Sequence, residues 1–405
     1  MFDVEEIRKE FPILEREVYG KRLIYLDSAA TAQKPKCVVD KMSELLLHDN
    51  ANIHRGVHLL SEEMTARYEE AREVVRQFIG AECREEVVFT SGATMSLNLV
   101  ASSWCEKFLH EGDNVVVSHI EHHSNIVPWQ LATERKCAEL RVIPVANSGA
   151  LELDTLDTLI DERTKVVAVT QASNTLGTCP DLAKIIAKAH SVGAVVVVDG
   201  CQGVVHGGVD VKALDCDFYA FSGHKLYGPT GIGVLYGKRE LLDKMPPYMG
   251  GGDMVDKVSF AKTTYAPLPL KFEAGTSNYI GAVGLAEAIK FLQSLNAEEV
   301  AEHERAMLDY ATEQLLQIEG LRIYGTTEGK APIVSFNVEG CDHYDIGMIL
   351  DKMGVAVRTG HHCAEPVMAR YGTNGVVRAS IALYTNKEDI DAFVKAVKRA
   401  VSMLK

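Results

Sequence analysis

The chain has 405 residues and a formal net charge of −14, with 42 lysines and arginines against 56 acidic residues. So acidic a protein is a poor partner for nucleic acid or an anionic membrane, and no apolar run approaches the roughly 18 residues that a membrane helix needs. Residues 1–10 are rich in acids and lack the apolar core of a signal peptide, so we expect a cytoplasmic protein.

Cysteine usage points away from both disulfides and zinc. The nine cysteines are scattered, include no Cys-x-x-Cys pair and are odd in number. They match neither a zinc pattern nor the disulfide framework of a small secreted protein. We expect most of them to be small core residues, with one reactive thiol among them.

The first predicted elements lead to a run of small side chains. Residues 1–20 have the pattern of an amphipathic segment, and residues 23–27 that of a short strand. That strand opens onto 28–32, which consists of serine, threonine and three alanines. Such a run fits either tight packing or a loop that floors an active site, and the pattern alone leaves both open.

A candidate phosphate site follows the predicted strand 86–90. A turn of mostly small residues, 91–96, leads from it into a helical stretch. Strand, turn and helix in this order can hold a phosphate at the helix N-terminus. The backbone near Ala93 and the Thr94 hydroxyl would be the donors, although an ordinary helix cap has the same pattern.

Three histidines, His119, His122 and His123, follow the apolar strand 114–118. Neighbouring positions face different ways, and no acid or cysteine stands at metal-ligand spacing from them. We therefore expect no metal site. An imidazole at a strand end can instead stack on a cofactor ring or move protons.

Strands alternate with helical patterns through the middle of the chain, at 140–145, 165–170 and 195–198. This alternation predicts βαβ units and a mostly parallel sheet with helices on both faces. Asp199 and Asn174 each follow a strand, so both are expected at the sheet edge where such folds bind ligands. The alternative for a strand-end aspartate is a turn or helix cap.

Lys225 lies in a tight turn directly after the apolar strand 218–221. Three glycines nearby let an anionic group approach the backbone, and Ser222 and His224 offer donors. An amine in such a pocket suits a Schiff base with a carbonyl cofactor, above all pyridoxal phosphate. A solvated loop lysine is the plain alternative. Asp199 favours the cofactor, because a carboxylate keeps a pyridine nitrogen protonated.

The last part of the chain predicts a second, α+β unit. Residues 247–280 are rich in loops, and long loops in a compact enzyme are often functional or interfacial. Helical periodicity then runs from 283 to 295. The elements expected after it are a helix at 297–318, a strand at 333–338, a helix at 343–353, a strand at 355–358 and a helix at 387–404.

Cys363 stands apart from the other cysteines, because a glycine and two histidines precede it and Arg358 lies upstream. Cationic and histidine neighbours lower the pKa of a thiol, which raises its thiolate fraction at neutral pH. A half-buried structural thiol is the alternative. Arg378 is a further candidate, since a guanidinium can bind a carboxylate bidentately; its alternative is a salt bridge.

Taken together, these stretches resemble the group II cysteine desulfurases of the SUF iron–sulfur assembly system, within the pyridoxal-phosphate-dependent class V aminotransferases. The resemblance covers nearly the whole chain, and the order and spacing of its motifs are specific. The motifs are Glu121-His122-His123, Asp199-Gly200-Cys201-Gln202, Ser222-Gly223-His224-Lys225, Phe272-Glu273-Ala274-Gly275-Thr276, Arg358-Thr359-Gly360-His361-His362-Cys363-Ala364 and Arg378-Ala379-Ser380.

The resemblance implies pyridoxal 5'-phosphate as cofactor. Lys225 would hold its aldehyde, Asp199 would pair with its pyridine nitrogen, and Gln202 would bond its phenolic oxygen. His122 would stack on the ring and assist proton transfer. The residues implied in binding the phosphate are Ala93, Thr94, Ser222, His224 and, from the other subunit of a homodimer, Thr276.

The same resemblance implies the fold and the substrate site. The fold is that of type I pyridoxal-phosphate enzymes, with a large domain (21–280) built on a mostly parallel seven-stranded sheet. A smaller α+β domain combines 1–20 with 281–405. The implied substrate-binding residues are Ala29, Asn174, Arg358 and Arg378.

The implied activity removes sulfur from L-cysteine and yields L-alanine and a persulfide on Cys363. A small sulfur-acceptor protein of the SUF system would take the sulfur for iron–sulfur cluster assembly. Selenocysteine lyase is the alternative within the same scaffold. One departure is Cys201, where most relatives carry alanine. Because the two side chains have similar volumes, we expect a small buried thiol there rather than a catalytic one.

Overall fold

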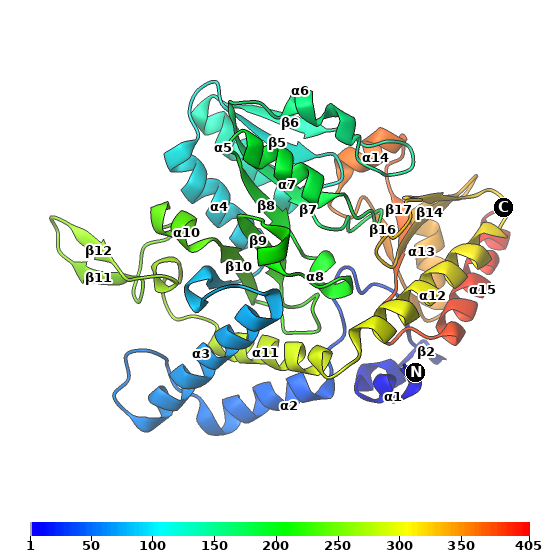
Figure 1. The fold of residues 1–405 in the computed structure, drawn as a ribbon. Helices are drawn as coiled ribbons and strands as arrows, with labels where there is room; N and C mark the ends of the chain where they lie inside the picture. The colour runs from blue at the N-terminus through cyan, green and yellow to red at the C-terminus, as the bar shows by residue number, and fades with distance from the viewer. Residues whose placement is uncertain (1) are drawn as a thin grey trace.

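The structure is a computed structural model that describes residues 2–405, and a seven-stranded sheet lies at its centre (Figure 1). The strands are β4 (Val87–Thr90), β5 (Asn114–Ser118), β6 (Glu139–Ile143), β7 (Thr164–Thr170), β8 (Val195–Asp199), β9 (Phe218–Ser222) and β10 (Gly233–Gly237). Their order across the sheet is β4-β10-β9-β8-β7-β5-β6. Only β10 runs antiparallel to its neighbours within this sheet. The predicted mostly parallel sheet is therefore confirmed, as is the α/β fold class.

Apolar residues on both faces of the central strands explain why this sheet is covered on both sides. Successive side chains of a strand point to opposite faces: Val196 and Val198 enter one core, and Val195 and Val197 the other. The first core contains residues of α3 (Leu59–Ile79), α7 (Leu182–Ser191), α8 (Gly203–His206), α9 (Val211–Leu214) and α11 (Tyr279–Gln293). The second contains residues of α4 (Ala93–Phe108), α5 (Val127–Lys136) and α10 (Arg239–Lys244).

A second, smaller sheet lies at the other end of the molecule (Figure 1). Its order is β13-β14-β17-β16, comprising Leu321–Tyr324, Ile333–Val338, Val376–Ser380 and Arg358–Gly360. Three helices pack on it in one apolar cluster: α12 (Ala297–Leu316), α13 (His343–Lys352) and α15 (Lys387–Leu404). A further helix, α14 (Glu365–Tyr371), follows β16.

The division of the chain into two domains, 21–280 and 1–20 with 281–405, stays a prediction. Two elements near these boundaries pack on the opposite side. The short strand β3 (Ile24–Tyr25) pairs in parallel with β15 (Val355–Ala356) and contributes to the smaller core. Helix α11 lies in the larger core. We propose a division that follows the two cores, with β3 on the small side and α11 on the large side.

Several elements were absent from the expectations. Helices α2 (Lys36–Glu44) and α3 precede the first strand of the large sheet. The loop-rich stretch contains a hairpin, β11 (Val255–Val258) and β12 (Thr263–Tyr265), which projects from the body of the molecule (Figure 1). The amphipathic N-terminus consists of α1 (Val4–Lys9) and a 3-10 helix (Pro12–Glu15). A hairpin of the strands β1 (Glu17–Val18) and β2 (Lys21–Arg22) follows it. In the middle of the chain, the short helix α6 (Leu156–Leu159) precedes β7. None of the helices within 2–405 combines the length and apolar character needed to cross a membrane.

Candidate active site

A cavity of about 170 Å³ lies at the carboxyl ends of the central strands, where the smaller sheet also contributes side chains. All the predicted site residues line it except Gln202 and Thr276. The lining residues are Ala29, Ala30, Ala93, Thr94, His122, Ser124, Asn174, Asp199, Cys201, Ser222, His224, Lys225, Arg358, His362, Cys363 and Arg378. Residues from one end of the sequence to the other thus meet around one small space.

The turn that carries Lys225 is held by its own backbone. The N–H of Gly223 donates to the carbonyl of Ile232 (2.9 Å), and the N–H of Gly228 donates to the carbonyl of Gly223 (2.9 Å). A Cβ on Gly223 would stand 2.8 Å from the Ile232 side chain, so only glycine fits this position. Burial, together with the Lys225 charge, lowers the pKa of His224 to about 4. The amine therefore occupies a rigid turn beside a neutral imidazole.

Asp199 ends β8 directly beside β9 and is buried. Its Oδ1 accepts the N–H of Cys201 at 3.0 Å. The Cys201 side chain is buried as well, and burial and the Asp199 charge raise the pKa of its thiol to about 12. Cys201 is thus a protonated thiol at neutral pH, next to the carboxylate that was predicted to face a pyridine nitrogen.

His122 begins the turn after β5 as a neutral ring. The Ser124 N–H donates to its Nδ1 at 3.1 Å, and the Ser124 hydroxyl lies 2.8 Å from the same atom. Nδ1 is therefore an acceptor, and the proton of the neutral ring sits on Nε2. Burial, with a contribution from the Lys225 charge, lowers the pKa of His122 to about 4.

Glu121, which was quoted in a motif but not predicted as a site residue, holds this turn by hydrogen bonds. It is fully buried, and burial raises its pKa to about 8. Its carboxyl group accepts hydrogen bonds from the Ser118 hydroxyl (2.5 Å), the Asn125 amide (2.6 Å) and the Thr170 N–H (2.9 Å). The position of Glu121 beside His122 was the only available signal, because its partners come together only in the folded chain.

Arg378 and Asn174 form one wall of the cavity, and Asp27 binds the arginine. Arg378 Nη2 donates to Asp27 Oδ1 at 3.0 Å, and its Nη1 donates to the carbonyl of Asn174 at 2.9 Å. Two buried atoms, Arg378 Nε and Asn174 Oδ1, have no hydrogen-bond partner among residues 2–405. Unpaired buried polar atoms are costly, so a polar ligand is the natural partner for this wall. Asp27 was not predicted as a site residue.

Cys363 lies in the short connection between β16 and α14, half-exposed and facing the same cavity. The N–H of His123 donates to the carbonyl of Cys363 at 2.8 Å, and the Asn174 amide donates to the carbonyl of His362 at 2.8 Å. Arg358, on β16, lines the cavity beside them. The thiol and the amine therefore approach one cavity from two different sheets.

Comparison with known proteins identifies the family. The aminotransferase class-V family model matches residues 24–393. The chain belongs to this family. It is 50% identical over 404 residues to a cysteine desulfurase of Enterobacter sp. (strain 638), covering 100% of this chain and 99% of that protein. A cysteine desulfurase of Salmonella agona is 49% identical with the same coverage.

Solved structures of two cysteine desulfurases match the fold over almost the whole chain. The cysteine desulfurase CsdA of Escherichia coli, an S-sulfonic acid form, superposes with a TM-score of 0.93 at 42% identity, with all of both chains covered. An apo cysteine desulfurase of Thermococcus onnurineus NA1 gives a TM-score of 0.93 at 39% identity over 98% of each chain. The predicted family and type I fold are confirmed.

The residues of this class-V cavity fit pyridoxal 5'-phosphate, the cofactor of the family. Lys225 would offer an amine to its aldehyde, and Asp199 would offer a carboxylate to its pyridine nitrogen. Helix α4 begins at Ala93 on the cavity wall, and its N-cap residue, Gly92, has no side chain to cap it. The Ala93 N–H donates to Ser222 Oγ at 2.9 Å, and the N–H groups that follow it in the first turn offer an anion site.

Two predicted residues lie outside the cavity. Gln202 is buried behind it and donates from Nε2 to the carbonyl of Ala29 at 2.8 Å. Thr276 lies in a separate hollow, together with Ser91 and Gly231. A single chain does not bring Thr276 to its own cavity. Its role in a neighbouring subunit stays a prediction.

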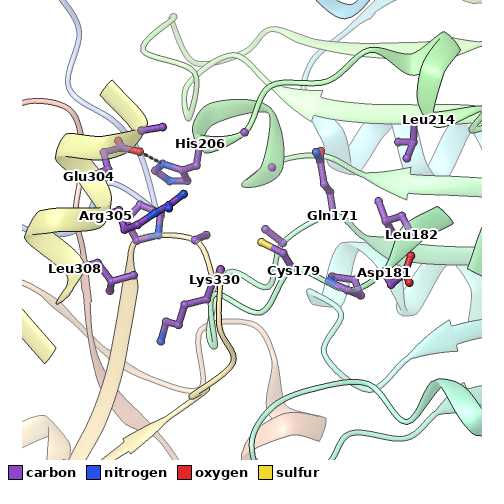
Figure 2. Close-up of a pocket in the computed structure, with 18 of the residues that line it drawn as sticks. Gln171, Cys179, Asp181, Leu182, His206, Leu214, Glu304, Arg305, Leu308 and Lys330 are labelled. Atoms are coloured by element: carbon purple, nitrogen blue, oxygen red, sulfur yellow. Dashed lines mark hydrogen bonds and ion pairs between the residues drawn. The ribbon is translucent and has the colours of Figure 1, made fainter. Parts of the chain in front are cut away.

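A larger cavity of about 620 Å³ lies between the two cores and contains none of the predicted residues (Figure 2). His206 pairs with Glu304 at one side of it, with Nδ1 2.8 Å from the carboxylate. Arg305 and Lys330 line the same space, and burial lowers the pKa of Lys330 to about 8. In neither cavity, nor elsewhere in residues 2–405, do three histidine, cysteine or acidic side chains gather in a way that could hold a metal ion.

Proposed function

We propose that this chain is a cysteine desulfurase, which converts L-cysteine into L-alanine and leaves a persulfide on Cys363. The observation that carries this proposal is the meeting of Cys363, Lys225 and Arg378 around one cavity of about 170 Å³. A transaminase would need the amine and the arginine but has no use for a thiol at that place. Relatives at 50% identity carry the same activity in their names.

Bound pyridoxal phosphate would supply an electron sink that loosens the Cα–H and Cβ–S bonds of the substrate. Arg378 would hold the substrate carboxylate, because its Nε is a donor that lacks a partner within the described chain. Asn174 lines the same wall, and its partnerless Oδ1 would accept a hydrogen bond from a donor group of the ligand. The Lys225 amine would accept the Cα proton and later return it. His122, neutral because burial lowers its pKa, would stack on the cofactor ring.

The Cys363 thiolate would then attack the substrate sulfur. An S–S bond forms as the Cβ–S bond breaks, its electron pair stays with the carbon skeleton, and protonation at Cβ yields alanine. The balance is one cysteine and one thiol in, one alanine and one persulfide out. Holding the thiol and the substrate in a single cavity supplies the orientation that such a transfer lacks in solution.

We also propose a homodimer in the cytoplasm that passes sulfur to a small acceptor protein of the SUF type for iron–sulfur assembly. Four features support this. Thr276 lies outside its own chain's cavity, and Phe260 at the tip of the projecting hairpin is fully exposed. All nine cysteines are free, as in a reducing compartment. Cys363 is half-exposed, which leaves its persulfide accessible to an acceptor.

The test is alanine and sulfide release from L-cysteine with a reductant present, for the wild type, Cys363→Ala and the control Cys341→Ala. We expect the wild type and the control to release both products. Cys363→Ala should lose both while it keeps the yellow colour of the bound cofactor. If the wild type releases selenium from L-selenocysteine but no sulfide from cysteine, the activity is that of a selenocysteine lyase instead.

A further inference from the structure

The loop that carries Cys363 has an unfavourable backbone. His362 and Cys363 adopt φ values of +53° and +56°, and Gly360 before them has a φ of +106°. Two consecutive residues with side chains in the left-handed region are unusual, because Cβ crowds the neighbouring carbonyl oxygen. Such a conformation persists only where the surroundings determine it. The contacts that hold this loop therefore also set where the thiol points.

Two histidine rings supply those contacts. The N–H of Cys363 donates to Nδ1 of His361 at 3.1 Å. The N–H of Glu365 donates to Nε2 of His123 at 3.2 Å, while the N–H of His123 itself donates to the carbonyl of Cys363 at 2.8 Å. The rings of His123 and His361 stack, with centroids 5.7 Å apart and planes at 24°. The peptide groups on both sides of the thiol are thus tied to one pair of rings.

Both rings can do this only when neutral. A ring nitrogen that accepts a backbone N–H carries no proton, so in each ring the proton sits on the other nitrogen. In an imidazolium both nitrogens are donors, and the accepting atom is lost. Two stacked cations would also repel each other.

The groups around the pair act in opposite directions. The Glu365 carboxylate at the start of α14 lies 3.9 Å from His123 Nε2 and favours protonation. Other titratable groups near the pair are His122 on the same turn, His362 beside His361, and Arg358 on β16. Burial, the largest effect, together with the neighbouring His361, lowers the pKa of His123 despite the carboxylate. The neutral form is thus favoured at physiological pH.

We propose that His123 and His361 are positioning residues for Cys363, which as neutral stacked rings hold the thiol loop in the orientation that sulfur transfer requires. This inference rests on the proposed function, because it assigns the rings a part in the step that Cys363 carries out. Neither histidine lines the cavity itself. They act through the loop backbone rather than on the substrate.

The test distinguishes the contribution of the accepting nitrogen from that of the stacked ring. His361→Asn and His123→Gln keep an oxygen close to the position of the accepting nitrogen. His361→Phe and His123→Phe keep a flat ring that can stack but has no acceptor. His110→Phe, at an exposed surface position, is the matched control. In each holoenzyme we would measure single-turnover persulfide formation from L-cysteine, divided by the rate of Cys363 alkylation with iodoacetamide, which reports the thiolate available.

At pH 8 we expect the two Phe variants to lose about tenfold or more in this ratio, with the cofactor absorbance unchanged. The amide variants and the control should stay within about threefold of the wild type. Between pH 7 and 5 the ratio should fall in the wild type and fall less in His123→Gln, because protonation of His123 removes its acceptor atom and an amide does not titrate. Wild-type ratios in the Phe variants, or equal losses in the Phe and amide variants, would overturn the proposal.

Amide hydrogen exchange keeps the positioning inference separate from the proposed function. Exchange in the peptide 361–368 should be faster in the Phe variants than in the amide variants, since the N–H groups of Cys363 and Glu365 lose their acceptors. If the wild type forms no persulfide from cysteine but this exchange pattern holds, the proposed function fails and the positioning role stands. If exchange is the same in all variants, the positioning role fails whatever the turnover.

Discussion

The two reactive groups of this protein are held in opposite ways. Lys225 follows β9, every residue of which is buried in the middle of the large sheet, and backbone hydrogen bonds close its turn. Cys363 follows β16, a strand at the edge of the small sheet, and side chains hold its loop by the backbone. An amine that must meet one cofactor atom benefits from a rigid turn. The Cys363 thiol must meet the substrate and then an acceptor. Its position depends on the side chains of His361 and His123, which bind the loop backbone.

The largest expected effect comes from a substitution of Lys225, the group held in the rigid turn. Lys225→Ala removes the amine that would carry the Cα proton, so alanine formation from L-cysteine should fall by about 10³-fold or more. Lys395→Ala, an exposed position on α15, is the control. The measurement is alanine production in the cofactor-saturated protein. Alanine formation by Lys225→Ala at a rate near that of the wild type would refute the assigned role.

Arg378 lines the cavity that Lys225 and Cys363 share, and a substitution there tests how the substrate carboxylate is bound. Arg378→Lys keeps a charge but loses the fork that can hold a carboxylate while bonding Asp27, so kcat/KM for L-cysteine should fall roughly 10- to 100-fold, mainly through KM. Cysteamine, which lacks the carboxylate, should be much less affected. Arg305→Lys on α12 serves as the control. An equal loss with cysteamine would mean that Arg378 acts on the structure rather than on the substrate carboxylate.

A third prediction concerns His362, which precedes Cys363 in the thiol loop and affects stability at low pH. Burial and the nearby Arg378 charge lower its pKa to about 3, so its contribution to stability is present above pH 6.5 and is lost as the pH falls toward 3. His362→Gln keeps a donor for the Val376 carbonyl, which Nε2 now bonds at 3.1 Å, but does not titrate. Between pH 6.5 and 4 the variant should lose about 1–3 kcal/mol less unfolding free energy than the wild type.

Urea unfolding of the cofactor-free protein at several pH values measures this difference. His48→Gln, at an exposed position, is the control and should follow the wild type. A His362→Gln curve that falls as steeply as that of the wild type would show that His362 is not the group that titrates.

An effect of similar size concerns Glu121, which precedes His122 on the large-sheet side. Its pKa is raised to about 8, so the folded state keeps a proton that the unfolded chain releases. This contribution is fully present below about pH 4.5 and is lost as the pH rises through 8. Glu121→Gln should lower the free energy of unfolding by about 1–3 kcal/mol, because the NH₂ group of the new amide would face the Asn125 donor. Its stability should also fall less than that of the wild type between pH 5 and 8, by urea unfolding. Parallel curves would contradict the assignment.

Local patterns were enough for the large sheet but not for every element around it. The valine runs of β7 and β8 could only form strands buried on both faces, and their ends placed Asp199 and Asn174 at the ligand-binding edge. Helix α3 and the β11–β12 hairpin were missed. The hairpin lies in a stretch whose glycines and prolines predict loops, and its exposed strands lack the alternation that burial on one face produces.

The sequence by itself determined the sheet, the turn with its lysine and the presence of a distinct thiol, because each of these depends on residues that are neighbours along the chain. Tertiary structure alone decided how the wall and the loop are held. Asp27 meets Arg378 across 351 positions, and His123 meets Glu365 across 242. No local periodicity records such pairs. The choice between a solvated arginine and a substrate clamp, or between a surface histidine and a support for Cys363, depends on which distant groups the fold brings within hydrogen-bonding distance.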